Sequence, residues 1–145
     1  MQIKRVQDSD IDRALKLIWE TFLEFEAPDY SEDGVQSFHE FIEDRAVVDS
    51  LLFFGAYDKE ELKGVIALNS ECTHICCFFV RARYHRQGIG RTLWEYVLAH
   101  SKNDMITVNS SPYAVPVYHK LGFTDTDSEQ LVDGIRYMPM KYERG

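Results

Sequence analysis

The stretch Phe78-Phe79-Val80-Arg81-Ala82-Arg83-Tyr84-His85-Arg86-Gln87-Gly88-Ile89-Gly90-Arg91-Thr92-Leu93 runs from an apolar strand, through a basic turn, into a helical pattern. Gly88 and Gly90 lack a Cβ atom, so the backbone there can adopt positive φ and approach a ligand closely. The first N–H groups of the helix have no intrahelical acceptor and carry partial positive charge. Because a phosphate group fits such a turn, we predict that the chain binds a phosphorylated ligand here.

The turn is basic although the chain has a net charge of −8. Two common phosphate-binding patterns do not match it. A Walker loop ends in Gly-Lys-Ser/Thr, whereas Gly90 is followed by Arg91 and Thr92, and a dinucleotide fingerprint needs a third glycine where the chain has Leu93. The basic side chains around the turn are Arg83, His85, Arg86 and Arg91.

A second segment, from Met105 to Phe123, has the same order of strand, turn and helix. Residues 105–108 form an apolar strand, Ser111 is a typical N-cap, and Pro112 suits the first helical position. Gly122 is the residue type that ends a helix. The pattern therefore predicts a helix from about residue 112 to residue 121.

Together the two segments resemble the Gcn5-related N-acetyltransferase (GNAT) superfamily. The first is similar to its acetyl-CoA signature, Arg/Gln-x-x-Gly-x-Gly/Ala, with His85 where Arg or Gln is usual. The second is similar to Asn-x-x-Ala-x-x-x-Tyr-x-x-x-Gly-Phe, with Ser111 at the Asn position. The residues in register with this second pattern are Ala114, Tyr118, Gly122 and Phe123.

The resemblance implies a single α/β (α+β) domain over residues 1–145, with the GNAT fold. We expect a mixed, mostly antiparallel sheet of six or seven strands, splayed at the CoA-binding strand, and about four helices. Local patterns agree, with an edge strand over 2–7 and helices capped by Asp8 or Ser9 and by Ser31. Further strands are expected over 51–57, 62–69 and 73–80, and a helix from Ile89 that buries Leu93, Tyr96 and Val97. Asp133-Gly134 predicts a two-residue hairpin.

Composition restricts the class of protein. The chain is 45% hydrophobic, enough for one core, and has no apolar run near the roughly 20 residues of a membrane helix. We expect a cytoplasmic protein with no membrane or nucleic-acid partner, and the sequence leaves a homodimer open. Its three cysteines, an odd number, predict reduced thiols rather than a disulfide framework.

The resemblance also implies the cosubstrate, acetyl-CoA, and the residues that bind it. Backbone amides of Phe78, Phe79 and Val80 would hold the pantetheine and polarise the thioester carbonyl, although the two phenylalanine side chains also suit a core. The expected acetyl-CoA-binding set is Phe78, Phe79, Val80, His85, Arg86, Gln87, Gly88, Ile89, Gly90, Arg91, Ser111 and Tyr118.

The implied activity is that of an N-acetyltransferase, in which a primary amine attacks the thioester directly. Tyr118 matches the superfamily tyrosine that protonates the departing thiolate, with core packing as the alternative. Many relatives carry a glutamate base twelve residues before this tyrosine, where the chain has Ile106. His74, fourteen residues before Gly88, matches the base position of the histone-acetylating branch, and a relay through water is the alternative.

No metal site is predicted, although His74 stands between Cys72 and Cys76. Residues two apart on a strand lie about 6.5 to 7 Å apart along a line, whereas zinc ligands converge on one point. Nothing around Cys76 or Cys77 marks an acyl-carrying thiolate either.

The acceptor is expected at the first two helices, where residues 20–44 hold nine carboxylates and no Lys or Arg. Such a surface attracts cations, so a polyamine, an aminoglycoside-like amine or a basic peptide end would suit it, while solvated helix faces are the alternative. A catalytically weak acyl-CoA sensor with the same fold remains a second functional hypothesis. The nine carboxylates are Glu20, Glu24, Glu26, Asp29, Glu32, Asp33, Glu40, Glu43 and Asp44.

Overall fold

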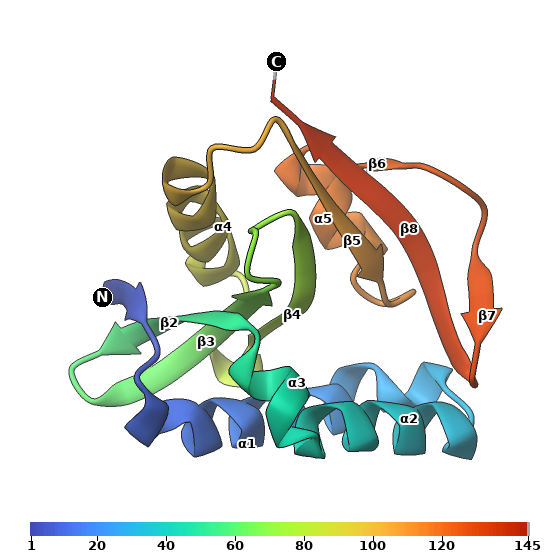
Figure 1. Cartoon of the computed structure of the whole chain (residues 1–145), viewed down its shortest axis with the longest axis horizontal. Helices are drawn as coiled ribbons and strands as arrows, with labels where there is room; N and C mark the ends of the chain where they lie inside the picture. Colours follow the sequence, from blue (N-terminus) through green and yellow to red (C-terminus); the bar gives the residue numbers. More distant parts are fainter. Residues whose placement is uncertain (145) are drawn as a thin grey trace.

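A mixed sheet of eight strands organises residues 1–144, the part of the chain that the computed structural model describes (Figure 1). The strands follow the order β1-β2-β3-β4-β5-β8-β6, and β7 pairs with β8. All neighbours are antiparallel except β4 and β5. The strands are β1 (Gln2–Arg5), β2 (Leu52–Asp58), β3 (Glu61–Leu68), β4 (His74–Val80), β5 (Met105–Ser110), β6 (Thr124–Asp125), β7 (Gln130–Val132) and β8 (Ile135–Glu143).

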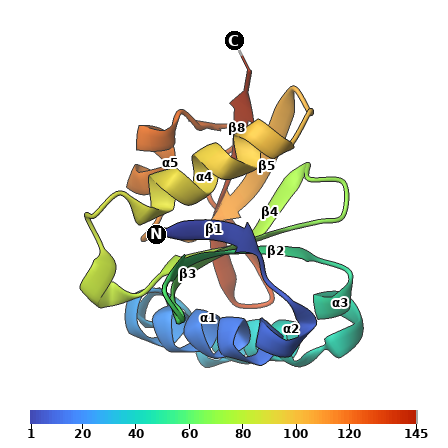
Figure 2. The same ribbon diagram turned by 90° about the vertical axis from the view of Figure 1, so that its left-hand side faces the viewer.

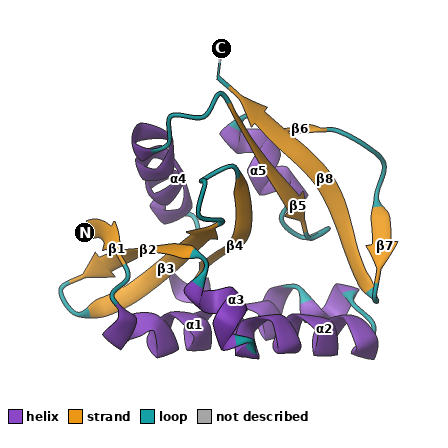
Figure 3. Cartoon of the chain, in the orientation of Figure 1, coloured by secondary structure: helices purple, strands orange, loops and turns teal. Residues whose placement is uncertain are grey.

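Helices cover both faces of the sheet, as Figures 2 and 3 show. One layer holds α1 (Ile11–Phe25), α2 (Glu32–Glu43) and α3 (Arg45–Asp49), and the other holds α4 (Ile89–His100) and α5 (Val115–Leu121). Each layer buries its own core. Leu17, Ile18 and Phe22 of α1 are fully buried on one side, and Leu93 and Trp94 of α4 are buried on the other. No helix within residues 1–144 has the length and apolar character to span a membrane.

The predicted fold class is confirmed, and several local details differ. Asp10, rather than Asp8 or Ser9, precedes α1, and it makes no capping bond because its carboxylate accepts hydrogen bonds from Arg13 and from the Tyr57 hydroxyl instead. Ser31 caps α2 as expected, by accepting a hydrogen bond from the amide of Gly34.

The helix predicted from residue 112 starts later. Pro112 lies in a turn, and α5 begins at Val115, with Pro116 taking the early helical position that tolerates a missing N–H. In α4, Trp94 is buried where Tyr96 was expected, and Tyr96 is half-buried. The short helix α3 had no clear sequence signal.

The centre of the sheet is splayed. The parallel strands β4 and β5 pair only at His74 with Thr107 and at Ile75 with Val108. Beyond these pairs β4 continues beside β3 as far as Val80, whereas β5 continues beside β8 as far as Ser110 (Figure 1). The second half of β4 therefore has a sheet partner on one edge only.

A β-bulge in β4 lies at the start of this splay. Ala67 of β3 faces Cys77 and Leu68 faces Ile75, so Cys76 is the extra residue. Ile75 packs with the α4 and α5 layer, whereas Cys77 and Phe79 pack with the α1 and α2 layer. Residues 75, 77 and 79 would share a face in a regular strand, so the bulge reverses which side chains point to each layer.

The β7–β8 hairpin turns at Asp133 and Gly134 as predicted, with φ of 52° and 78°, and it reaches α2. The Ser37 hydroxyl donates a 3.1 Å hydrogen bond to the Asp133 carbonyl. Gly34 and Gly134 are in close backbone contact, because a Cβ on Gly34 would lie 2.1 Å from the Gly134 carbonyl oxygen. The hairpin can dock on α2 only if residue 34 has no side chain.

We predict that Gly34→Ala lowers the free energy of unfolding by about 1 to 3 kcal/mol, the usual cost of an overpacked contact, despite alanine's higher helix propensity. Gly90→Ala is the matched control, because a Cβ there would meet nothing closer than the Phe78 ring at 3.7 Å. Urea denaturation of both variants measures the difference. Equal stability of the two variants would show that the hairpin contact can relax without cost.

Candidate active site

A cleft of about 540 Å³ lies between the end of β4, the start of α4, α5 and the C-terminal end of α1. Gly88, one of its lining residues, is the N-cap of α4, with φ of 80°, and Arg86 also has a positive φ, of 65°. A Cβ on Gly88 would meet no atom within 4 Å, so this position opens into the cleft. Gly90 does not have positive φ, contrary to the expectation, because it already lies in the first turn of α4.

The predicted basic residues divide into two groups. Arg86 and Arg91 line the cleft, whereas Arg83 forms an ion pair with Glu61 and is not among its lining residues. Gln87 is also outside the lining and donates a hydrogen bond to the Arg83 carbonyl. Lys120, which sequence analysis missed, lines the cleft from the last turn of α5, and its carbonyl accepts a hydrogen bond from Arg91.

His85, which departs from the superfamily pattern, connects the turn to the strand. Its Nε2 lies 2.6 Å from the Val80 carbonyl oxygen, and its ring packs against Phe25 of α1. Phe25 in turn packs against Tyr113. The imidazole therefore stabilises the shape of the cleft wall.

The register of β3 and β4 decides which amides face the splay. The Arg81 amide donates to the Lys63 carbonyl, so Val65 and Phe79 also form a hydrogen-bonded pair. Phe78 and Val80 occupy the alternate positions, where the N–H groups point away from β3. Of the three amides expected to bind the pantetheine, those of Phe78 and Val80 therefore face the splay. The amide of Phe79 points to β3 instead.

A second cavity, of about 340 Å³, lies on the other side of the splay. Its walls come from β4, β5, α2, α5, the segment between α1 and α2, and the start of β8. His74 and Ser111 line this cavity and are absent from the lining of the first, so Ser111 lies on the side opposite to its predicted role. The two cavities share five lining residues, which are Glu26, Phe78, Phe79, Ala114 and Tyr118.

Tyr118 is buried, and its ring packs edge-on against Phe78 and Phe123. Burial, followed by the nearby charges of Glu26 and Cys77, raises the pKa of Tyr118 well above its ordinary value. The phenol is therefore protonated at neutral pH and can only donate a proton.

Glu26, at the C-cap of α1, is the most perturbed carboxylate of the site. Burial raises its pKa from 4.5 to about 7, the Asp29 charge adds to this effect, and the Ser111 side chain opposes it. In the sequence Glu26 is only one of nine carboxylates. Its one distinguishing feature there is its position directly after the last turn of the first helix. Whether that turn points into the molecule depends on tertiary packing, which the sequence alone does not show.

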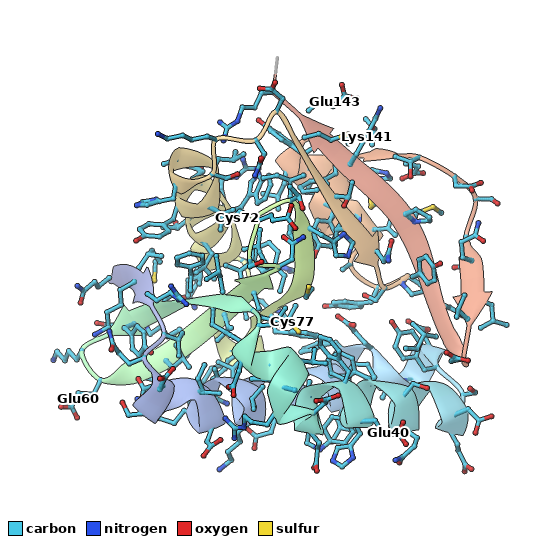
Figure 4. The ribbon with its side chains drawn as sticks, in the orientation of Figure 1. Glu40, Glu60, Cys72, Cys77, Lys141 and Glu143 are labelled. Atoms are coloured by element: carbon cyan, nitrogen blue, oxygen red, sulfur yellow. The ribbon has the colours of Figure 1, made fainter. Side chains whose placement is uncertain are left out.

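The other eight carboxylates of residues 20–44 are exposed and line neither cavity. Glu20 pairs with Arg81, and Glu40 lies on the outer side of α2, in contrast to the interior Cys77 (Figure 4). Residues 1–144 contain no group of three His, Cys, Asp or Glu side chains arranged for a metal ion. Burial raises the pKa of the Cys77 thiol strongly, so it is not a ready nucleophile.

His74 lies where β4 and β5 are still paired. Its Nδ1 is 2.7 Å from the Thr107 hydroxyl oxygen, and burial lowers the pKa of the imidazole. A neutral histidine at this position can accept a proton, although it lines only the second cavity.

We predict that Glu26→Gln stabilises the fold at pH 8 but not at pH 4. A folded-state pKa raised from 4.5 to about 7 means that the wild type loses stability as pH rises between these values. The amide does not titrate, so the stability difference should widen by on the order of 2 to 3 kcal/mol. Urea denaturation across this pH range measures it. The control is Glu24→Gln on the exposed side of α1, and a pH-independent gap for Glu26→Gln would contradict a desolvated carboxylate.

Comparisons with known proteins agree with the fold. A search of curated protein sequences finds no match. Among solved structures, a GCN5-related N-acetyltransferase from Rhodopseudomonas palustris superposes with a TM-score of 0.84 at 18% identity, covering 99% of this chain and 95% of that one. The PaiA N-acetyltransferase from Thermoplasma acidophilum, in complex with coenzyme A, gives a TM-score of 0.80 at 18% identity, with coverage of 99% and 98%.

Tetrahymena GCN5 is more distant, with a TM-score of 0.66 at 13% identity and coverage of 99% of this chain and 96% of that one. At these low identities, the superpositions establish a shared fold. The family model described as "Acetyltransferase (GNAT) domain" matches residues 26–144. With this match over most of its length, the chain belongs to the GNAT acetyltransferase family.

Proposed function

We propose that this protein is an acetyl-CoA-dependent N-acetyltransferase that acts on a primary amine by direct transfer in a ternary complex. The observation that carries the proposal is the meeting of two cavities at Glu26 and Tyr118. Direct transfer needs a thioester and an amine to approach from opposite sides of one point, with a proton acceptor and a proton donor beside it.

The first cleft has the features that acetyl-CoA requires. The pyrophosphate would bind at the amides after Gly88, next to Arg86 and Arg91. The pantetheine would extend along β4, where the amides of Phe78 and Val80 can bind the thioester carbonyl and stabilise its developing negative charge. The coenzyme A complex of the PaiA relative supports this assignment.

We assign the general base to Glu26. A carboxylate with a pKa of about 7 is half ionised at neutral pH, which suits proton transfer. An alkylammonium ion has a pKa near 10, but burial in the cavity lowers that value toward the pKa of Glu26. The amine is assigned to the second cavity. Glu26 lines both cavities, whereas His74 lines only the second, so His74 remains the second candidate for the base.

Tyr118 is proposed as the general acid. The amine nitrogen forms a bond to the thioester carbon, the C–S bond breaks, and the thiolate takes the phenolic proton. A raised phenol pKa does not prevent this transfer, because the same burial raises the pKa of a thiol in this region, as it does for Cys77.

We predict that Tyr118→Phe and Glu26→Gln each lower kcat by roughly 10²-fold or more, the usual contribution of general acid–base catalysis. For the wild type, log(kcat/KM) should rise with pH through about 7, since the base must be ionised. Glu26→Gln should abolish this limb, and His74→Ala should retain it. Initial rates from pH 5 to 9 with two amines of different basicity make the measurement.

A limb that disappears in His74→Ala and persists in Glu26→Gln would reverse the assignment of the base. If the wild type acetylates no amine but binds acetyl-CoA by calorimetry, the alternative of a catalytically weak acyl-CoA sensor is supported instead.

We predict that Arg86→Glu weakens coenzyme A binding by on the order of 10- to 100-fold, because it replaces a phosphate-pairing charge with a repelling one. Arg83→Glu is the matched control. It makes the same charge change three residues away, outside the cleft lining, and should alter the dissociation constant by less than about 3-fold. Calorimetry with coenzyme A measures both, and equal losses would argue for a long-range charge effect rather than a local site.

A further inference from the structure

The second cavity is lined by six aromatic rings, which belong to Tyr30, Phe38, Phe41, Phe78, Phe79 and Tyr118. Its lining residues include one carboxylate, Glu26, and no Lys or Arg. Glu26 is at the end shared with the first cleft, so the cavity has a single charged end and an aromatic interior.

The aromatic wall is held in place by its own packing. The Phe38 ring stacks on the Phe22 ring with centroids 4.1 Å apart, and it also contacts Phe41 and Phe79. Because Phe22 is fully buried in the core, the wall is anchored to α1 and does not depend on a ligand for its position. Such a surface is ready to receive an apolar group.

The polar groups of the cavity are mostly engaged with the protein itself. The Ser37 hydroxyl donates to the Asp133 carbonyl, and the Ser110 hydroxyl donates to the Ser111 carbonyl. His74 pairs with Thr107. Asn109 is exposed at the rim. A second ammonium group deep in the cavity would therefore find no carboxylate among its lining residues.

Energetics disfavour such a second charge. Removing an ammonium ion from water costs several kcal/mol, while contact with an aromatic face returns about 0.5 to 2 kcal/mol. An aryl group instead gains from burial at roughly 25 cal/mol per Å² of apolar surface. The volume is also suitable, since a cavity of about 150 Å³ holds benzene and this one measures about 340 Å³.

We infer that the acceptor is a monoamine that carries an aromatic or compact apolar group, with its amino group at Glu26 and its apolar part among the rings of Phe38, Phe41 and Phe79. This inference rests on the proposed function and narrows it. The exposed carboxylates of α1 and α2 can still attract a cationic amine to the surface, as predicted, but they do not line its proposed binding site.

The test uses three amines with the purified protein. n-Pentylamine and 1,5-diaminopentane differ only in the second ammonium group. 2-Phenylethylamine is a monoamine, like n-pentylamine, but carries an aromatic ring in place of the outer part of the alkyl chain. The kcat/KM values should fall in the order 2-phenylethylamine, n-pentylamine, 1,5-diaminopentane, with at least 10-fold between the first and the last. Calorimetric binding of the same amines to the coenzyme A complex should give the same order without relying on turnover.

Phe41→Glu adds a carboxylate to the far wall and should improve 1,5-diaminopentane relative to n-pentylamine by at least 10-fold. Phe41→Leu, which keeps the wall apolar, is the control and should keep the wild-type order of these two amines. Melting temperature and coenzyme A affinity of both variants report whether the fold and the first cleft are intact. If Phe41→Glu does not fold, the order of kcat/KM for the three amines with the wild type tests the inference by itself.

The possible outcomes separate the two proposals. A wild type that acetylates 1,5-diaminopentane as well as or better than n-pentylamine overturns the inferred acceptor class and leaves the acetyltransferase proposal intact. A wild type that binds 2-phenylethylamine preferentially but acetylates none of the amines retains the inferred binding preference and contradicts the proposed function. Absence of both preferential binding and acetylation overturns both.

Discussion

The separation of β4 from β5 is the constraint on which the rest of the structure depends. Two parallel pairs, at His74 and Ile75, hold the strands together, and beyond them the sheet divides. A strand edge inside a protein leaves amides that need acceptors, and in this fold they face a cleft rather than a neighbouring strand. The edge of β4 can remain unpaired because the first half of the strand, the β3 ladder and two helical layers already hold it in place.

The splay also explains the position of Glu26, the carboxylate whose pKa is raised to about 7. The end of α1 packs beneath the divided sheet, so Glu26 is half-buried next to Tyr118 and Cys77. A carboxylate that is kept partly protonated near neutral pH costs folding free energy. This local loss of stability is the expected cost of placing the proposed base where the two cavities meet.

The wall of the second cavity is assembled from segments distant in sequence. α2 contributes aromatic side chains, the β7–β8 hairpin contributes Ile135, and the Gly34–Gly134 contact holds the two together. The hairpin is otherwise exposed, with Leu131 and Val132 facing solvent. Changes to the hairpin can therefore alter the wall of the second cavity, whereas the turn at Gly88 lines the other one.

The sequence by itself determined the family, the turn at Gly88 and the hairpin at Asp133-Gly134, because each depends on local residue types at a short, defined spacing. It also predicted a role for Tyr118, through its register with Gly122 and Phe123, and this side chain lines both cavities. It could not single out Glu26 from eight neighbouring carboxylates, separate Arg83 from Arg86, or assign Ser111 to a side of the splay. Those distinctions depend on burial and on partners such as Glu61, which lies more than twenty residues from Arg83. Desolvation and long-range pairing arise only when the layers pack together, so the tertiary structure alone decided which charges face the two cavities.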